Sequence, residues 1–387
     1  MTNVLVVMPI STLDFGSRSS GGVDSVCQIL LDSLVQSNQV RFNYTVIAFN
    51  PFNDLTQEGK CTSFSKHLTI YQYNSKPKSA KNKVPLPGIL HQNIIIWKFV
   101  RKFKPQILHT HLLSWQILPN ISTANIATLH AYKKYGRSSV SMLNDLLYEK
   151  IIPYVANKNI NLYTAVSKKL QIAASNTNKT IEVIYNPLPE KYSNIDIVEA
   201  QTPRLDYINL VTCSNITKNK GIHHAINVLH ELSRKKVGCH LHVIGGLTNS
   251  NYQRQIFKQV KEYGLETNIT FHGKLITTEI LNIYKISNYG LFLSAEETFG
   301  LVPLEMISCG LQTICTRVGI MDDLYKEFRQ LDIYILDSIN PSEIANYILT
   351  QNNSKLIDAK QFIIDKFAKE KIIQQYEVLY ESAVSAK

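Results

Sequence analysis

Two glutamates separated by seven residues mark the segment with the most chemical content in this chain of 387 residues. They are Glu297 and Glu305, in the run Glu-Thr-Phe-Gly-Leu-Val-Pro-Leu-Glu. Ionised carboxylates accept hydrogen bonds from vicinal hydroxyl groups, such as those of a ribose or a hexose. The spacing therefore suggests a site for sugar hydroxyls. The alternative is that these acids only complement the dipole of a helix start.

A buried strand and a helix are predicted to hold the two glutamates. Residues 289–295 form a short apolar run that is typical of a buried strand in an α/β sheet. Apolar and small residues then recur at helical spacing as far as Gly310, which is suited to end the helix. The glutamates thus lie near the carboxyl edge of a sheet, where open α/β sheets bind ligands. Free N–H groups around Gly300, Leu301 and Val302 favour a phosphate at the helix start.

Residues 297–305 resemble the E-x7-E signature of family 4 glycosyltransferases, which are retaining enzymes with the GT-B fold. The resemblance implies an α/β chain with two Rossmann-like parallel-sheet domains facing across a cleft. It also implies a nucleotide-sugar donor, with Glu305 on the ribose and Glu297 as a catalytic residue on the transferred sugar. The backbone of Phe299, Gly300, Leu301 and Val302 would bind the diphosphate.

Two further loops match the donor site of that family. Residues 214–221 (Ser-Asn-Ile-Thr-Lys-Asn-Lys-Gly) resemble its Gly-Arg-Leu-x-x-x-Lys-Gly loop, which makes Lys220 a catalytic cation beside the diphosphate. Asn215, at a substrate-binding position, stands where the family usually has arginine. Three explanations stay open: a nearby lysine supplies the missing charge, the diphosphate site is weaker, or the donor is an unusual one. Lys274 and Leu275 follow a predicted strand, and the resemblance places the nucleobase there.

The first half of the chain supplies the other candidate residues. An apolar strand at residues 4–8 is followed by a polar loop and by Gly21-Gly22 at a helix start. This is not the G-x-G-x-x-G fingerprint, which disfavours a nicotinamide dehydrogenase. The resemblance implies backbone contacts of Gly21 and Gly22 with donor phosphates and acceptor. It also makes His130 a catalytic candidate that meets the donor sugar or the acceptor, and a structural histidine is the alternative.

Alternating strand and helix patterns predict two α/β domains joined by a linker. The expected acceptor-side domain spans residues 1–186, and the expected nucleotide-sugar-binding domain spans residues 205–366. Residues 187–204 contain prolines and little periodicity, which is typical of a linker. An amphipathic pattern at residues 367–387 predicts a last helix that crosses back to the first domain.

No metal ion or other cofactor is expected. The six cysteines include no Cys-x2-Cys pair, which favours reduced core residues in a reducing compartment. The pairs His109-x-His111 and His240-x-His242 each place two imidazoles on one face of a strand, but neither shows a third clustered ligand.

The formal net charge of +11 suggests an acidic partner or an anionic surface. Basic residues gather at 76–83 and again at 98–104, where they alternate with Trp97, Phe99 and Phe103. The predicted partners are an anionic membrane surface or a lipid-linked glycan acceptor, with a solvated face as the alternative. Nucleic acid is not expected, because no recognition motif is present. Lacking a signal peptide or a long apolar run, the chain is expected to be cytoplasmic, or peripheral on the inner face of the plasma membrane.

These features together predict a retaining, metal-independent hexosyltransferase. It would move a hexose from a UDP- or GDP-sugar to a hydroxyl of a glycan acceptor. The expected acceptor is a lipid-linked intermediate of bacterial surface polysaccharide, such as lipopolysaccharide O-antigen or capsule. The alternatives are a GT-B-like sugar-nucleotide epimerase and a degenerate nucleotide-sugar-binding module. A nonenzymatic membrane-surface protein would explain the basic residues but not the presence of Glu297 and Glu305.

Overall fold

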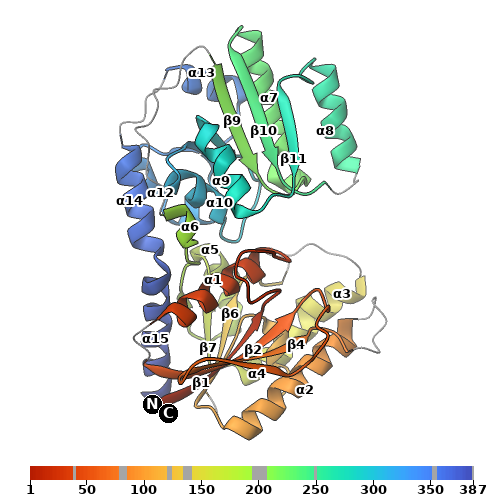
Figure 1. The fold of residues 1–387 in the computed structure, drawn as a ribbon, viewed down its shortest axis with the longest axis vertical. Helices are drawn as coiled ribbons and strands as arrows, with labels where there is room; N and C mark the ends of the chain where they lie inside the picture. Colours follow the sequence, from red (N-terminus) through yellow and green to blue (C-terminus); the bar gives the residue numbers. More distant parts are fainter. Residues whose placement is uncertain are drawn as a thin grey trace. The chain divides into compact units, whose positions relative to one another are not determined.

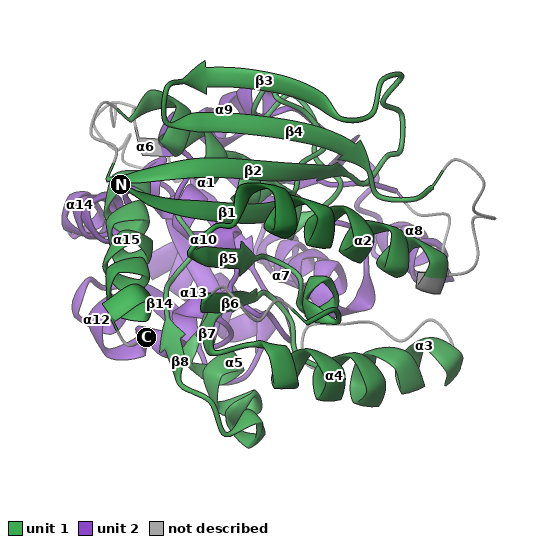
Figure 2. Cartoon of the chain, turned by 90° about the horizontal axis from the view of Figure 1, so that it is seen from below, with its two compact units in different colours: residues 1–187, 369–387 green, residues 188–368 purple. Residues whose placement is uncertain are grey.

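The computed structural model describes residues 1–37, 41–77, 85–119, 124–133, 142–193, 207–247, 251–350 and 355–385. The chain divides into two compact units (Figure 2). Unit 1 comprises residues 1–187 and 369–387, and unit 2 comprises residues 188–368. Residues 188–193, predicted as part of the linker, belong to unit 2, and residues 194–204 of that linker lie outside the described residues.

Unit 1 is built on an eight-stranded sheet in the order β3-β4-β2-β1-β5-β6-β7-β8, which can be followed in Figure 2, and Figure 1 shows the same sheet from another side. All neighbours pair in parallel except β3, which runs antiparallel to β4. The strands are β1 (Thr2–Pro9), β2 (Phe42–Asn50), β3 (Lys60–Ser65), β4 (Leu68–Asn74), β5 (Ile107–Thr110), β6 (Ala124–Leu129), β7 (Leu162–Ala165) and β8 (Ile181–Val183).

Helices cover both faces of this sheet because the central strand β1 is apolar on both. Leu5 and Val7 pack toward α2 and η1, whereas Val6 and Met8 face α1 and α15. The helical elements of unit 1 are α1 (Gly22–Gln36), α2 (Pro85–Phe103), η1 (Leu113–Gln116), α3 (Met142–Leu146), η2 (Leu147–Ile151), α4 (Ile152–Asn159), α5 (Lys168–Ala173), η3 (Ser175–Thr177) and α15 (Lys369–Ser385).

Unit 2 contains a six-stranded sheet, entirely parallel, in the order β11-β10-β9-β12-β13-β14. The first strand lies in the middle, the next two follow on one side and the last three on the other, which is the Rossmann strand order. The strands are β9 (Tyr207–Cys213), β10 (Gly238–Ile244), β11 (Ile269–Gly273), β12 (Tyr289–Phe292), β13 (Gln312–Thr316) and β14 (Tyr334–Leu336). The predicted pair of Rossmann-like domains is thereby confirmed.

One core of unit 2 lies between its sheet and three helices, α7, α8 and α13. The helical elements of unit 2 are α6 (Glu190–Ser193), η4 (Lys218–Lys220), α7 (Ile222–Arg234), α8 (Asn251–Glu262), α9 (Thr277–Ile286), α10 (Leu301–Ser308), α11 (Ile320–Asp323), α12 (Tyr325–Gln330), α13 (Pro341–Thr350) and α14 (Leu356–Phe367). Phe367 ends α14, and α15 begins at Lys369, so the predicted C-terminal helix is a single helix that begins two residues later than expected.

Candidate functional site

The loop after β9 and the loop after β12 meet at the point where the strand order of unit 2 reverses. These two strands are neighbours in the sheet, so their carboxyl ends lie side by side. The N–H of Ala295 donates to the carbonyl of Asn219 at 2.7 Å. Gly221 has a φ of 70° and packs so closely that a Cβ there would lie 2.0 Å from the Leu293 carbonyl oxygen. The sheet therefore fixes the Lys220 loop against the segment that carries Glu297.

We expect Gly221→Ala to lower the free energy of unfolding by about 3–5 kcal/mol, because the new methyl group overlaps the backbone of Leu293. Gly264→Ala is the matched control, since Gly264 has a similar φ of 64° and no atom near the position of a Cβ. That control should lose only about 1–2 kcal/mol, the cost of the left-handed backbone. Urea unfolding of both variants measures the difference, and equal losses would contradict the close packing.

Lys220 and Glu297 form an ion pair at this junction. Lys220 Nζ lies 2.6 Å from Glu297 Oε1, and the Ser294 hydroxyl donates to the same oxygen at 3.0 Å. The side chains are only 30% and 13% exposed, so a partner that reaches them meets a partly desolvated pair. The structure thus brings together two residues that are 77 positions apart in the sequence.

Helix α10 begins at Leu301 directly after these residues, and no side chain caps its start. Gly300 precedes it with a φ of 85°, a conformation that favours glycine. The N–H groups of Gly300, Leu301 and Val302 come too early in the helix for intrahelical acceptors, and they point toward whatever binds in front of it. The helix ends at Ser308, earlier than predicted, with Gly310 in the left-handed region closing the turn.

Glu305 lies one turn further along α10 and has a different environment. The residue is half-buried, and the hydroxyls of Tyr192 and Tyr284 and the thiols of Cys213 and Cys309 are close enough to interact electrostatically with its carboxylate. Among the described residues none forms a hydrogen bond or ion pair with it. Burial raises the pKa of Glu305 from 4.5 to about 7. An acceptor in this setting is available to a ligand that brings its own hydroxyl donors.

The other predicted donor-site residues lie on neighbouring loops at the same edge of the sheet. Asn215 is exposed after β9, beside Gly246, whose carbonyl accepts the N–H of Ile216 at 3.3 Å. Lys274 is exposed and Leu275 half-buried, directly after β11, the first strand of the sheet order.

Gly21, Gly22 and His130 belong to unit 1. The two glycines are exposed at the start of α1, and the space where their Cβ atoms would lie is open. Buried Asp24 holds the preceding loop, because its carboxylate accepts the N–H groups of Ser11 and Ser20 at 3.0 and 2.7 Å. A ligand could therefore approach the backbone of both glycines closely.

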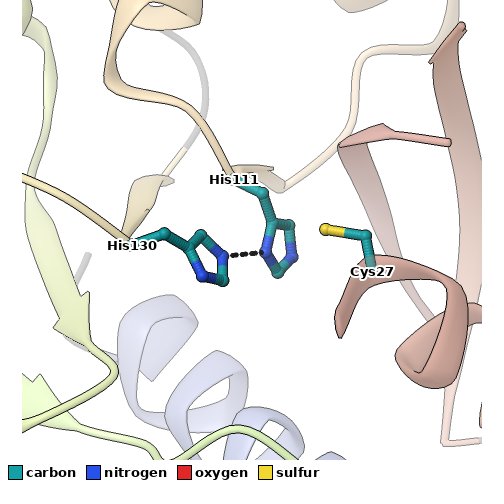
Figure 3. A group of neighbouring side chains, drawn as sticks. All are labelled: Cys27, His111 and His130. Carbon is teal, nitrogen blue, oxygen red and sulfur yellow. Dashed lines mark hydrogen bonds between the residues drawn. The ribbon is translucent and has the colours of Figure 1, made fainter. Parts of the chain in front are cut away.

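His130 follows β6 and is part of a buried group with His111 and Cys27 (Figure 3). His111 Nδ1 and His130 Nε2 lie 3.1 Å apart, so the two rings share a hydrogen bond. Burial lowers the pKa of His130 to about 4, which keeps the ring neutral at physiological pH. The sequence pattern indicated no third ligand near His109-x-His111, and the structure corrects this. Cys27 from α1 and His130 from β6 both lie beside His111.

The other histidine pair is accounted for by sheet contacts. His240 Nε2 lies 2.8 Å from the Thr270 hydroxyl, and His242 Nδ1 lies 3.0 Å from His272 Nε2. Within the described residues, no metal-ligand group forms around this pair.

Comparison with known proteins shows the fold and finds a family match for part of the chain. In structure, the chain is similar to sucrose-phosphate synthase from Thermosynechococcus elongatus, with a TM-score of 0.77, 16% identity and full coverage of both chains. It is also similar to Anabaena HepE in complex with UDP and glucose, with a TM-score of 0.68 and 15% identity over 99% of this chain and 100% of that one. The chain has the GT-B fold.

In sequence, residues 195–363 match the family model described as "Glycosyl transferases group 1". One relative is N-acetyl-alpha-D-glucosaminyl L-malate synthase of Bacillus anthracis, 24% identical over 52% of this chain and 54% of the relative. The matches span about half the length of the curated relatives.

Proposed function

We propose that the protein is a retaining glycosyltransferase that transfers a hexose from a UDP- or GDP-sugar to a hydroxyl of a glycan acceptor. The observation that carries the proposal is the Lys220–Glu297 ion pair at the reversal point of the unit 2 sheet, in front of the uncapped start of α10. The family match of residues 195–363 and the UDP and glucose bound by Anabaena HepE support a nucleotide-sugar donor.

Each residue at this junction has a role that suits its chemistry. The diphosphate binds the N–H groups from Phe299 to Val302, and Lys220 supplies a cation. Glu297 then exchanges Lys220 for hydroxyls of the transferred sugar. Glu305 accepts hydrogen bonds from the ribose diol. Lys274 and Leu275 approach the nucleobase, and Asn215 contributes a neutral contact near the phosphates.

Transfer proceeds without a metal ion in this proposal. The bond between the sugar C1 and the phosphate oxygen breaks, and a bond from C1 to the acceptor oxygen forms on the same face. The acceptor proton passes to the departing phosphate, and nucleoside diphosphate leaves. Charge on that leaving group is stabilised by Lys220 and the helix N–H groups, a form of catalysis that usually makes the largest contribution. His130, Gly21 and Gly22 are proposed contacts of unit 1 with the sugar or acceptor.

A panel of UDP-, GDP- and ADP-sugars tests the donor site through the thermal unfolding temperature. At least one donor should raise it at saturating concentration, by mass action on the folded state. Release of nucleoside diphosphate that depends on an added acceptor then separates transfer from epimerisation or simple binding. Absence of stabilisation by every member of the panel would overturn the proposed donor site.

We also propose that the acceptor is lipid-linked, as in bacterial surface polysaccharide synthesis, and that unit 1 docks on an anionic membrane surface. Helix α2 and the segment α3-η2-α4 pack against η1 on one side of the sheet (Figure 2). Both helical segments expose large apolar side chains, namely Leu90, Ile94, Met142, Leu143 and Leu146. Exposed cations follow on the same segments, namely Lys98, Arg101, Lys102, Lys150 and Lys158. Such a face suits the headgroup region of an anionic bilayer.

The structure corrects one part of the predicted basic and aromatic patch. Phe99 and Phe103 point inward, stack on each other and contact the Tyr71 ring, whereas Arg101 covers the Trp97 ring at 4.2 Å. The exposed apolar character comes instead from the aliphatic residues of the same helix. Residues 78–83 of the predicted patch lie outside the described residues. No helix in the described ranges combines the length and the hydropathy that a membrane span requires.

Binding to phosphatidylglycerol-containing vesicles should weaken by roughly tenfold or more in Lys98→Gln/Lys102→Gln, since each cation near the surface contributes about 1 kcal/mol. Lys235→Gln/Lys326→Gln removes the same charge from exposed positions of unit 2 and should bind like the wild type. In the same sedimentation assay, Ile94→Ser/Leu143→Ser should also weaken binding, with Ile172→Ser, 70% exposed on α5, as its control. Equal binding by variants and controls would contradict the docking surface.

A further inference from the structure

Three elements of unit 1 deliver potential metal ligands to one place at the carboxyl edge of its sheet. Cys27 comes from α1, His111 directly follows β5, and His130 directly follows β6. One ligand atom from each residue lies within 4.8 Å of the other two, and Figure 3 shows the Cys27 sulfur pointing toward the His111 ring. The exposed fractions are 0%, 1% and 8%, so water does not compete freely for these groups.

The protein leaves part of this group unsatisfied. The hydrogen bond between the two rings occupies one nitrogen of His111, and its Nε2 is buried without a partner among the described residues. The buried Cys27 thiol likewise makes no hydrogen bond to any described residue. A metal ion bound through His111 Nδ1 and His130 Nε2 would replace this hydrogen bond by two metal–nitrogen bonds, and the unpaired Nε2 takes no part in them.

The spacing of the rings suits coordination of one ion. In a tetrahedral zinc site with Zn–N bonds of 2.0–2.1 Å, the two nitrogens lie about 3.3 Å apart. The observed separation of His111 Nδ1 and His130 Nε2 is 3.1 Å. Sulfur and nitrogen lie roughly 3.6 Å apart in such a site. The ligand atoms of Cys27 and the histidines lie within 4.8 Å of one another, so the Cys27 sulfur has to move toward the ring nitrogens by at most about 1 Å.

We propose that Cys27, His111 and His130 bind a zinc ion, with a water molecule as the fourth ligand. One thiolate and two neutral imidazoles are a ligand set that zinc favours. The neighbouring His109 ring is held by Tyr380 and Thr128 at 2.6 and 2.7 Å, and it forms a rigid wall beside His111. The ion ties α1 to β5 and β6 within unit 1.

Protonation makes binding dependent on pH in a defined way. Neutral imidazole and thiolate are the forms that bind a metal ion. Binding therefore replaces the thiol proton by Zn2+ and releases one proton to solvent. Coordination through His130 Nε2 leaves its second ring nitrogen for the sugar contact proposed above. The site itself does not depend on that function.

Titration of the metal-free full-length protein with Co2+ tests the proposal. The expected result is one bound ion per chain, with a near-ultraviolet sulfur-to-cobalt charge-transfer band that Zn2+ removes by competition. Cys27→Ser should lose the band, and Cys61→Ser, which alters an exposed cysteine on β3, should keep it. The unfolding temperature of the wild type should rise with Zn2+, and that of His111→Gln should not.

Three results would overturn the zinc site. They are the absence of a stoichiometric bound ion in the wild type, a bound cobalt without sulfur charge transfer, and an unchanged band in Cys27→Ser. The wild-type measurements decide the question even if both variants fail to fold.

Discussion

Lys220→Met is expected to lower the rate of sugar transfer by about two to three orders of magnitude, the usual cost of removing one preorganised charge contact from a transition state. Lys220 is the cation paired with Glu297 at 2.6 Å, and Asn215 provides no second positive charge on its loop. Of the groups proposed above to stabilise the leaving diphosphate, only the helix N–H groups would then remain. Steady-state release of nucleoside diphosphate measures the effect, which should fall mainly on kcat.

Two further variants separate this role from a structural one. Lys235→Met removes an exposed cation at the end of α7 and should leave the rate unchanged. Lys220→Arg keeps the charge and should recover part of the lost rate. Lys220→Met also leaves Glu297 without its cation, so thermal unfolding of the donor-free protein must accompany the kinetics. A wild-type rate in a folded Lys220→Met protein would remove Lys220 from the catalytic residues.

The sequence was most informative where a single segment carries both the structural pattern and the chemistry. Strand β12, the glycine before α10 and both glutamates lie within residues 289–305, and the apolar run at residues 4–8 of β1 was equally clear. Edge strand β3 was missed because its residues are mostly exposed and polar, as is usual at the rim of a sheet. Strand β4 was missed beside it, although its residues alternate between buried and half-buried.

Side-chain contacts that depend on strand order could not be predicted from the pattern of adjacent residues. The Lys220–Glu297 pair exists because β12 pairs with β9, and the residues of the two loops do not indicate that these strands are neighbours. The same holds for Cys27, His111 and His130, which three separate elements bring together. No third ligand was expected beside His109-x-His111 because Cys27 and His130 are far from that pair in the sequence.

Glu305→Gln is expected to have opposite effects on stability and on donor binding. In the folded chain burial raises the pKa of Glu305 from 4.5 to about 7, so the folded state binds more protons than the unfolded state between these values. The free energy of unfolding therefore falls as pH rises through this window. Above it, the ionised carboxylate destabilises the folded state. Glutamine carries no charge to bury, and at pH 8 the variant should be more stable than the wild type by on the order of 2 kcal/mol. At pH 4.5 the gain should be small.

Donor affinity should change in the other direction, because glutamine replaces a charged acceptor of ribose hydroxyls by a neutral amide. Hydrogen bonds to charged groups contribute about 1.5–3 kcal/mol, so affinity should fall by roughly 10- to 100-fold. Wild-type affinity should also rise between pH 6 and 8 as Glu305 ionises, whereas that of the variant should stay flat. Calorimetric titration must use the intact nucleotide sugar, because the terminal phosphate of the free diphosphate titrates in the same range.

Glu266→Gln is the matched control, since Glu266 is exposed on another loop of unit 2 and should alter neither quantity. A gain in stability without a loss of affinity would mean that the Glu305 carboxylate destabilises the fold and does not bind the donor. A loss of both would make it a structural residue. Only the combination of higher stability and weaker, pH-independent binding fits a carboxylate that the fold keeps unpaired for the ribose.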